Sequence, residues 1–184
     1  MGTFTAATAI PTGSLITSAW MTNTVGDINF LGAAGGTTVA KDLAYLRRTT
    51  SQSLTASVWT ATLFDAEDID AANGHSTTTN TSRYTAVAAG KYRITGAVSF
   101  TWASGTADFG VGFRKNGSGT GIVGLVSGST NILYTQPAAA GYIVAPTVYV
   151  ALAVGDWVEQ IVYCSGTTPS AAANTQMGVE WVGV

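Results

Sequence analysis

Short segments in which large apolar residues alternate with small or polar ones recur along most of this chain, and they constrain its fold more than any other feature. The clearest is GKYRITGAVSF, residues 90–100, where most of the alternate positions from Tyr92 to Phe100 are large and apolar. Because successive side chains of a strand point to opposite sides of a sheet, this period of two predicts a strand with one buried face.

Comparable segments predict further strands at 57–64, 82–87, 107–117, 121–128, 131–135, 141–154, 157–164 and 177–184. Asn116-Gly117 predicts a two-residue hairpin, and Gly155-Asp156 predicts a turn. Pro146 lies inside the longest apolar segment, which places that segment at a sheet edge or at a bulge. Eight or more strands at spacings near ten residues favour an all-β sandwich or jelly roll over a parallel sheet.

Charged residues make up only 10% of the chain, against about 25% in a typical domain, and the formal net charge is −2. A surface this neutral is poorly protected from association, so the composition favours an oligomer whose interfaces hide apolar area. The eight Lys and Arg residues are scattered, which argues against nucleic acid as a partner. No run of about 18 apolar residues predicts a membrane span, and the first residues lack the features of a signal peptide.

The first fifty residues differ from the rest of the chain. Residues 17–31 carry Met21, Val25 and Ile28 at helical spacing, and residues 37–48 carry apolar residues at positions 39, 43 and 46. Two short amphipathic helices are therefore predicted, and they need a surface on which to dock. We expect an N-terminal anchoring segment, helical or extended, over residues 1–50 and a β domain over residues 51–184.

The β region resembles the C1q-like globular domain of the complement and tumour necrosis factor superfamily. YTAVAAGKYRITGAVSF is similar to the signature strand pair of that family through Tyr84, Gly90, Tyr92 and Ile94. FRKNG, residues 113–117, resembles the following strand and hairpin. VALAVGDWVEQIVY resembles a family turn through four positions, which are Leu152, Gly155, Asp156 and Val158. The resemblance covers about residues 52–184, although the usual proline before Gly90 is absent.

The resemblance implies a ten-stranded C1q/TNF-like jelly-roll sandwich that assembles as a homotrimer. It also implies that the C-terminal strand, MGVEWVGV, lies inside the subunit near the threefold axis. Apolar residues on nearly both faces of that segment agree with a position away from a solvated edge. The residues expected at the trimer core are Tyr92, Ile94, Val179, Trp181 and Val182.

The N-terminal segment resembles the leading segments of bacteriophage tail and fibre proteins. The matching positions are Gly13, Ile16, Thr17, Asn23, Val25, Asp27 and Leu31. This resemblance implies a virion structural protein that binds other virion proteins through its N-terminal segment. We expect a tail fibre or receptor-binding tip that attaches to host-surface glycans. The alternatives are a head decoration protein that stabilises the capsid shell and a free lectin-like carbohydrate-binding module.

An acidic stretch, predicted to be irregular, follows the first strand of the β region. Its carboxylates are Asp65, Glu67, Asp68 and Asp70. Hard cations take several oxygen ligands, and the family resemblance admits a calcium ion at this place. The alternative is a solvated loop whose charges keep a neutral surface soluble.

Catalytic groups are few. His75 is the only histidine and Cys164 the only cysteine, too few for a zinc site or a histidine-based triad. We expect His75 to be a plain loop residue, Cys164 to be a buried thiol, and the protein not to be an enzyme. Trp102 lies near a predicted loop and is the candidate for stacking on a sugar, with burial in the core as the alternative.

Overall fold

The computed structural model describes residues 43–128, 130–136 and 140–183, and all of its regular elements are strands. Within these residues no helix has the length and apolar character needed to span a membrane. The predicted all-β class is therefore confirmed. The predicted helix over residues 17–31 lies outside the described residues.

Twelve strands follow one another along the chain. They are β1 (Leu43–Arg47), β2 (Gln52–Ser53), β3 (Thr60–Ala61), β4 (Ala66–Asp70), β5 (Arg83–Thr85), β6 (Gly90–Thr101), β7 (Ala107–Lys115), β8 (Asn131–Gln136), β9 (Ala140–Leu152), β10 (Trp157–Cys164), β11 (Ser170–Ala171) and β12 (Gln176–Gly183).

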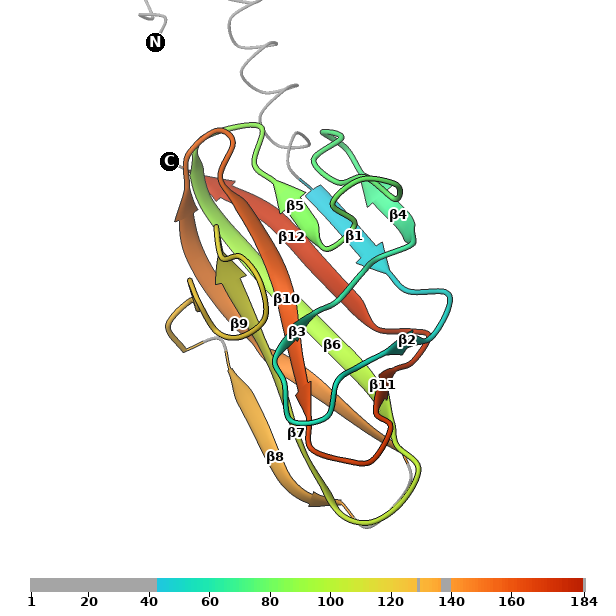
Figure 1. Cartoon of the computed structure of the whole chain (residues 1–184). Coiled ribbons are helices and arrows are strands. Elements are labelled where there is room, and N and C mark those ends of the chain that lie inside the picture. Colours follow the sequence, from blue (N-terminus) through green and yellow to red (C-terminus); the bar gives the residue numbers. More distant parts are fainter. Residues whose placement is uncertain (1–42, 129, 137–139, 184) are drawn as a thin grey trace, which may run out of the picture. The chain divides into compact units, whose positions relative to one another are not determined.

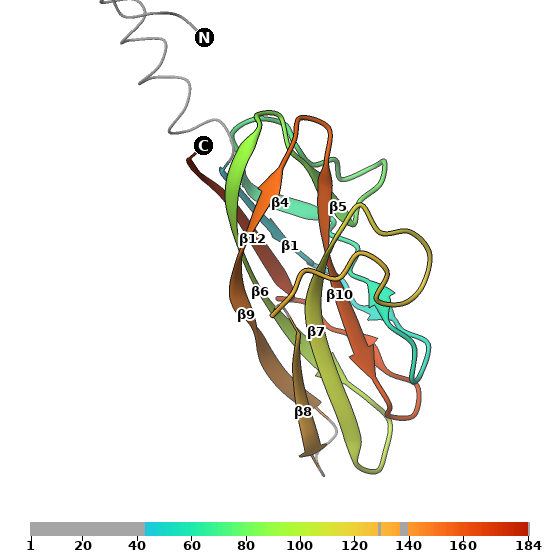
Figure 2. The ribbon, with the colours of Figure 1, turned by 90° about the vertical axis from the view of Figure 1, so that its left-hand side faces the viewer.

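The strands form two antiparallel sheets that lie as separate layers, as Figures 1 and 2 show. In the seven-stranded sheet, β9 pairs with one edge of β6, and β12 and β11 pair with its other edge. β12 continues to β1 and β4, and β11 continues to β2. The five-stranded sheet has the order β8, β7, β10, with β3 and β5 both paired to the far edge of β10.

The core lies between the two sheets and is rich in aromatic residues. Tyr92, Ile94, Val98 and Phe100 of β6 are fully buried, as their alternation predicts. From the opposing sheet, Phe109 of β7 stacks on Phe100 with ring centroids 5.0 Å apart. Such contacts between inward-facing residues of two sheets are what holds a sandwich together.

β12 occupies the middle of the seven-stranded sheet, because it pairs with β6 on one side and with β1 on the other. Met177 and Val179 point into the core and are at most 1% exposed, whereas Val182, at a register irregularity between Trp181 and Gly183, is 45% exposed. The sequence prediction that this segment avoids a sheet edge is confirmed.

The helix predicted over residues 37–48 is wrong where the structure describes it. Residues 43–47 form β1, which pairs with β12 and β4. Ala44 and Leu46 are buried and alternate with more exposed neighbours, so the true period is two. The helical spacing of positions 39, 43 and 46 does not determine the local structure. Pairing with β12 on one side and β4 on the other makes residues 43–47 a strand. The sandwich thus includes residues that precede the predicted boundary at residue 51.

Three further segments differ from the expectation. The acidic stretch contains a strand, β4, although its sequence lacks large buried residues. Residues 57–64 form only the two-residue strand β3. Residues 117–128 form a loop, with one isolated bridge between Arg114 and Leu125, instead of the second strand of a hairpin. Glycines at 117, 119, 121, 124 and 128 favour this loop, because each weakens a strand.

The predicted bulge and turn are both present. The register between β6 and β9 shifts between Ile94 and Gly96, opposite the segment 145–148 that contains Pro146. Gly155 has φ +86°, a backbone conformation that glycine adopts readily, and it begins the turn into β10. Asp156 completes this turn, since its carboxylate accepts a hydrogen bond from the Ala153 N–H at 2.8 Å.

Candidate functional site

The face of the seven-stranded sheet that points away from the core carries an unusual set of side chains, and we call it the outer face. Its residues come from β1, β4, β6, β9 and β12 and alternate with the core residues of the same strands. They are Leu43, Tyr45, Ile69, Arg93, Thr95, Tyr149, Gly178 and Glu180.

Large apolar or aromatic side chains are exposed on this face. Leu43 is 39% exposed, Ile69 is 45% exposed, and Tyr149 is 65% exposed. Single exposed apolar residues are normal on protein surfaces, but several on one sheet face form a patch of the kind found at interaction sites. The outer face is therefore the candidate functional surface.

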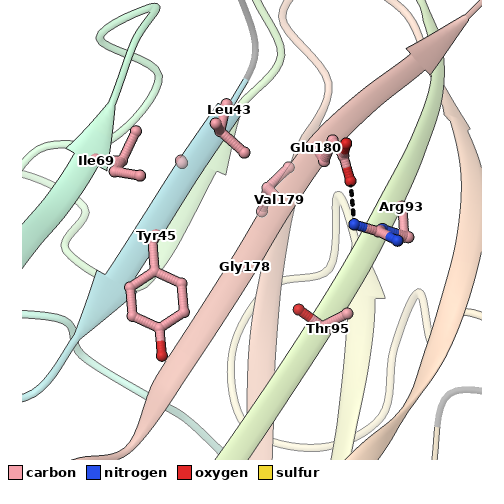
Figure 3. A pocket seen from close by; sticks show the side chains of 9 residues that line it. Leu43, Tyr45, Ile69, Arg93, Thr95, Gly178, Val179 and Glu180 are labelled. Atoms are coloured by element: carbon pink, nitrogen blue, oxygen red, sulfur yellow. Dashed lines mark ion pairs between the residues drawn. The ribbon is translucent and has the colours of Figure 1, made fainter. Parts of the chain in front are cut away.

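A hollow of about 200 Å³ lies in the outer face at Gly178 (Figure 3). In the register of the strands, Gly178 lies directly between Tyr45 of β1 and Thr95 of β6. Ile69 extends the same row on β4. The hollow exists because position 178 carries no side chain while its neighbours on both sides do.

Charged groups line one side of this hollow. Arg93 and Glu180 are directly opposite each other on β6 and β12 and form an ion pair. Their side chains remain 48% and 40% exposed. The Tyr45 hydroxyl is hydrogen-bonded to Gln176 on the other side. The hollow thus combines apolar walls with one positive and one negative group.

A second polar cluster lies on the five-stranded sheet, and its members contact one another within the chain. Glu159 is 1% exposed and accepts hydrogen bonds from Arg114, with Nη2 at 2.6 Å from its Oε2 atom. Its other oxygen is 3.4 Å from the Ser82 hydroxyl and 3.7 Å from Arg83 Nε. Arg114 also donates to the Gly121 carbonyl at 2.9 Å. This cluster fixes the loop after β7 to the sheet, and its carboxylate is closed to a substrate.

Trp102 is buried, which is the alternative that the sequence left open beside an exposed, sugar-stacking indole. The residue is 3% exposed, and its ring centroid lies 4.7 Å from that of Phe109. Its Nε1–H donates to the Gly105 carbonyl at 2.8 Å. Gly166 packs so closely on it that an added Cβ would lie 2.8 Å from the Trp102 Cβ. The polar atom of the indole is satisfied locally, which lets the ring serve the core.

The acidic residues proposed for calcium do not converge. Asp65 accepts from the Thr49 and Thr50 N–H groups, at 2.6 and 3.2 Å, and from the Thr50 hydroxyl. Glu67 binds His75, and Asp68 pairs with Arg47 at 2.7 Å. Asp70 accepts from the Gly74 and His75 N–H groups, at 3.0 and 2.9 Å.

Because each carboxylate has separate partners, these residues do not fit a calcium ion. In the part of the chain that the structure describes, no group of three or more His, Cys, Asp or Glu residues is placed to hold a metal. Burial acts to raise the pKa of Asp65, but the hydrogen bonds from Thr50 and Thr49 outweigh it and lower this pKa to about 2.

His75 lies in the loop between β4 and β5, as predicted, but it is buried. Its side chain has no exposed surface, and its Nδ1 atom is 2.7 Å from the Glu67 carboxylate. Nε2 is 3.0 Å from the Thr81 carbonyl, and the ring edge packs on Phe64. Both ring nitrogens are occupied by groups of this chain, so neither is available to a metal or a substrate.

Cys164 is buried at the end of β10. Burial raises the pKa of its thiol, which disfavours the thiolate that nucleophilic chemistry needs. This agrees with the expectation of a structural thiol.

The residues expected at the trimer core divide into two groups. Tyr92, Ile94 and Val179 are at most 1% exposed and pack inside the sandwich of a single chain. Trp181 is partly buried and donates from Nε1 to the Ala89 carbonyl at 3.2 Å, and Val182 is exposed. Of this set, only Trp181 and Val182 have surface left for a second chain, and a contact between chains stays a prediction for them.

Sequence reasoning missed Leu43, Tyr45, Ile69, Tyr149 and Gly178 as members of one surface. Leu43 and Tyr45 were assigned to a helix, and Ile69 to an irregular loop. The usable signal was the sequence LAYLR, in which Ala44 and Leu46 alternate with Leu43, Tyr45 and Arg47. The register that brings β1, β12 and β6 together cannot be read from any one of these segments.

Known structures share this architecture. The globular domain of zebrafish complement 1qA protein matches with a TM-score of 0.57 and 12% sequence identity, over 77% of this chain and 97% of that chain. Murine APRIL matches with a TM-score of 0.52 and 12% identity, over 76% of this chain and 98% of that chain. No protein-family model and no curated protein sequence matches the chain. The likenesses show a C1q/TNF-like jelly-roll fold, which confirms the predicted architecture.

Proposed function

We propose that this protein is a non-enzymatic structural module that assembles as a homotrimer through the outer face of its seven-stranded sheet. The observation that carries the proposal is the exposure of Leu43, Ile69 and Tyr149 on that one face. A monomer with a charged fraction of only 10% would leave this patch in water, whereas a closed oligomer buries it.

The remaining observations support the absence of catalysis. Glu159, His75 and Cys164 are buried and engaged within the chain or disfavoured as the reactive species. The carboxylates of the acidic stretch are engaged by separate groups of the chain, and the charged residues that line the hollow at Gly178 are paired with each other. The hollow has the character of a packing site, with apolar walls and a balanced ion pair at one side.

We further propose that the module belongs to a bacteriophage virion and serves in attachment to the host surface. The support is the resemblance of the N-terminal segment to leading segments of tail and fibre proteins. In this proposal, residues 1–42 bind other virion proteins and the jelly roll projects outward. The burial of Trp102 weakens the lectin alternative, because the residue chosen for sugar stacking is not accessible.

Two experiments test these proposals separately. Sedimentation equilibrium of the full chain should give a mass three times 18.8 kDa at micromolar concentration. A stable monomer would contradict the trimer. Electron microscopy of intact particles with an antibody against the jelly roll should label the tail or its fibres. Labelling spread over the head would favour the decoration role instead, and unlabelled particles would remove the virion assignment.

A further inference from the structure

The outer face carries a projecting side chain as well as a hollow. Tyr149 of β9 is 65% exposed and lies directly opposite Arg93 in the register of β6 and β9. Arg93 is opposite Glu180, and Glu180 is opposite Leu43. Tyr149 is therefore at one end of a row that runs across four strands, on the same side of the sheet as the hollow at Gly178.

Tyr149 does not fill the hollow of its own chain. Two strand spacings, about 10 Å, separate β9 from β12 across the sheet, and side chains stand roughly perpendicular to a sheet. The side chains that line the hollow come from β1, β4, β6 and β12, and Tyr149 is not among them. A projecting ring and an unfilled hollow thus lie on one surface without meeting within the chain.

We propose that the Tyr149 ring of one copy of this chain inserts into the hollow at Gly178 of the next copy. This inference rests on the proposed homotrimer and names the contact that holds it together. The ring and the hollow lie on different strands of the outer face, so each copy gives its ring to one neighbour and receives a ring from the other neighbour. A contact of this heterologous kind closes into a cycle when the rotation between copies is a simple fraction of a turn, as in a trimer.

The chemistry of the hollow suits a tyrosine. Leu43, Ile69 and the ring of Tyr45 supply apolar contact for the body of the side chain. A buried tyrosine hydroxyl needs a hydrogen-bond partner, and Arg93 and Glu180 offer a donor and an acceptor beside the hollow. Both charged groups are still 40% or more exposed, so neither must leave the other to make this bond.

Gly178 determines whether the hollow exists. A Cβ atom added at this position would lie 2.7 Å from the Thr95 hydroxyl and 3.9 Å from the Tyr45 ring. Any side chain at 178 therefore takes up the space that the incoming ring needs. The inference predicts that position 178 must stay small for assembly, although its place in the middle of a strand does not itself demand glycine.

The first test compares the trimer dissociation constants of full-length variants by analytical ultracentrifugation. Tyr149→Ala should raise the dissociation constant at least about 30-fold, the effect of losing a central interface residue. Tyr149→Phe keeps the ring and should raise it less than about tenfold. Val154→Ala is the matched control, because Val154 is 68% exposed but lies in the turn before β10 and should leave assembly unchanged.

The second test blocks the hollow and maps the contact. Gly178→Val combined with Thr95→Ala fills the hollow while removing the hydroxyl that the new side chain would meet, and it should yield folded monomers by ultracentrifugation and circular dichroism. Full-length protein with the photocrosslinker benzoylphenylalanine at position 149 keeps the native Gly178 and should form covalent trimers on irradiation. Mass spectrometry should place the crosslinks in residues 43–45 or 178–180 of a neighbouring copy.

The outcomes separate this inference from the proposed function. If the unaltered chain is a monomer, both are overturned. If it is a trimer that Tyr149→Ala leaves intact and whose crosslinks map elsewhere, the homotrimer stands and the ring-in-hollow contact is overturned. Should the variant that combines Gly178→Val with Thr95→Ala fail to fold, the dissociation constants of the Tyr149 variants and the crosslink positions still test the contact.

Discussion

The guanidinium of Arg114 donates two hydrogen bonds to one carboxylate oxygen of Glu159, from Nε at 2.9 Å and from Nη2 at 2.6 Å. Neither side chain is more than 3% exposed. The two residues are directly opposite on β7 and β10, so the sheet register itself sets them side by side. A buried ion pair of this kind is strongly sensitive to the loss of either partner, since the other is then left charged and desolvated.

Arg114→Met should lower the free energy of unfolding by about 3–5 kcal/mol, because the buried Glu159 carboxylate then keeps only the Ser82 hydroxyl and the more distant Arg83. Urea unfolding followed by fluorescence measures the change. Arg47→Met is the matched control. Arg47 and Asp68 form an ion pair of similar length, 2.7 Å, but their side chains are 42% and 43% exposed. That variant should lose at most about 1 kcal/mol. Equal losses in the two variants would show that burial of the Arg114 pair is energetically unimportant.

Acid should destabilise the domain in part through Asp65. Its pKa in the folded chain is about 2, below the usual 3.8, so its contribution to stability is complete above about pH 4 and is lost as the pH falls towards 2. Asp65→Asn should therefore be less stable than the unaltered chain at pH 7 and should show a shallower loss between pH 4 and pH 2. Thermal melting across this range measures both. If Asp65→Asn lost stability with falling pH as steeply as the unaltered chain, Asp65 would not be a cause of the acid sensitivity.

Trp102→Ala should lower the free energy of unfolding by about 3–5 kcal/mol, because it opens a cavity beside Phe109. Gly166→Ala should also destabilise, by about 1–3 kcal/mol, since the new methyl group would meet the indole. Urea unfolding measures both effects. Trp102→Phe is the control that retains most of the ring and should lose less than the alanine variant. A Trp102→Ala protein of unchanged stability would mean that the indole is not part of the core.

Two N-terminal deletions should behave differently. Removal of residues 1–42 should leave the sandwich folded, because β1 begins at Leu43. Removal of residues 1–48 takes β1 from between β12 and β4, and it deletes the buried side chains of Ala44 and Leu46. We expect soluble protein with a cooperative melting transition from the first deletion and insoluble or non-cooperative protein from the second. A folded second product would show that β1 is dispensable.

Sequence reasoning succeeded where local pattern and tertiary environment agree. β6 and β12 bury one face over much of their length, so alternation located them. β7 and β10 are buried on both faces, and their apolar sequences indicated strands as well. Gly90 was also informative, since it begins β6 at a point where an added Cβ would lie 2.2 Å from Trp181 Nε1. The C1q-like resemblance depended on residues of this kind.

The same reasoning failed where partners from distant segments decide the outcome. β1 fits a helical spacing as well as a strand, and only its place between β12 and β4 makes it a strand. The acidic carboxylates are close in sequence but belong to a strand and its flanks, where each meets a different partner. The outer face required the register of five strands, which no single segment contains.

The central position of β12 also has a kinetic meaning. Its contacts with β1 join residues far apart in the chain, as with Tyr45 and Gln176, which are separated by 131 positions. Bringing the two ends of so long a segment together costs chain entropy before the contacts between them compensate for it. Domains dominated by such pairings fold in milliseconds to seconds. Until β12 arrives, β6 and β1 present unpaired backbone groups along their edges. We therefore expect the time that this sheet spends incomplete, as well as its final stability, to affect how much of the protein folds without aggregating.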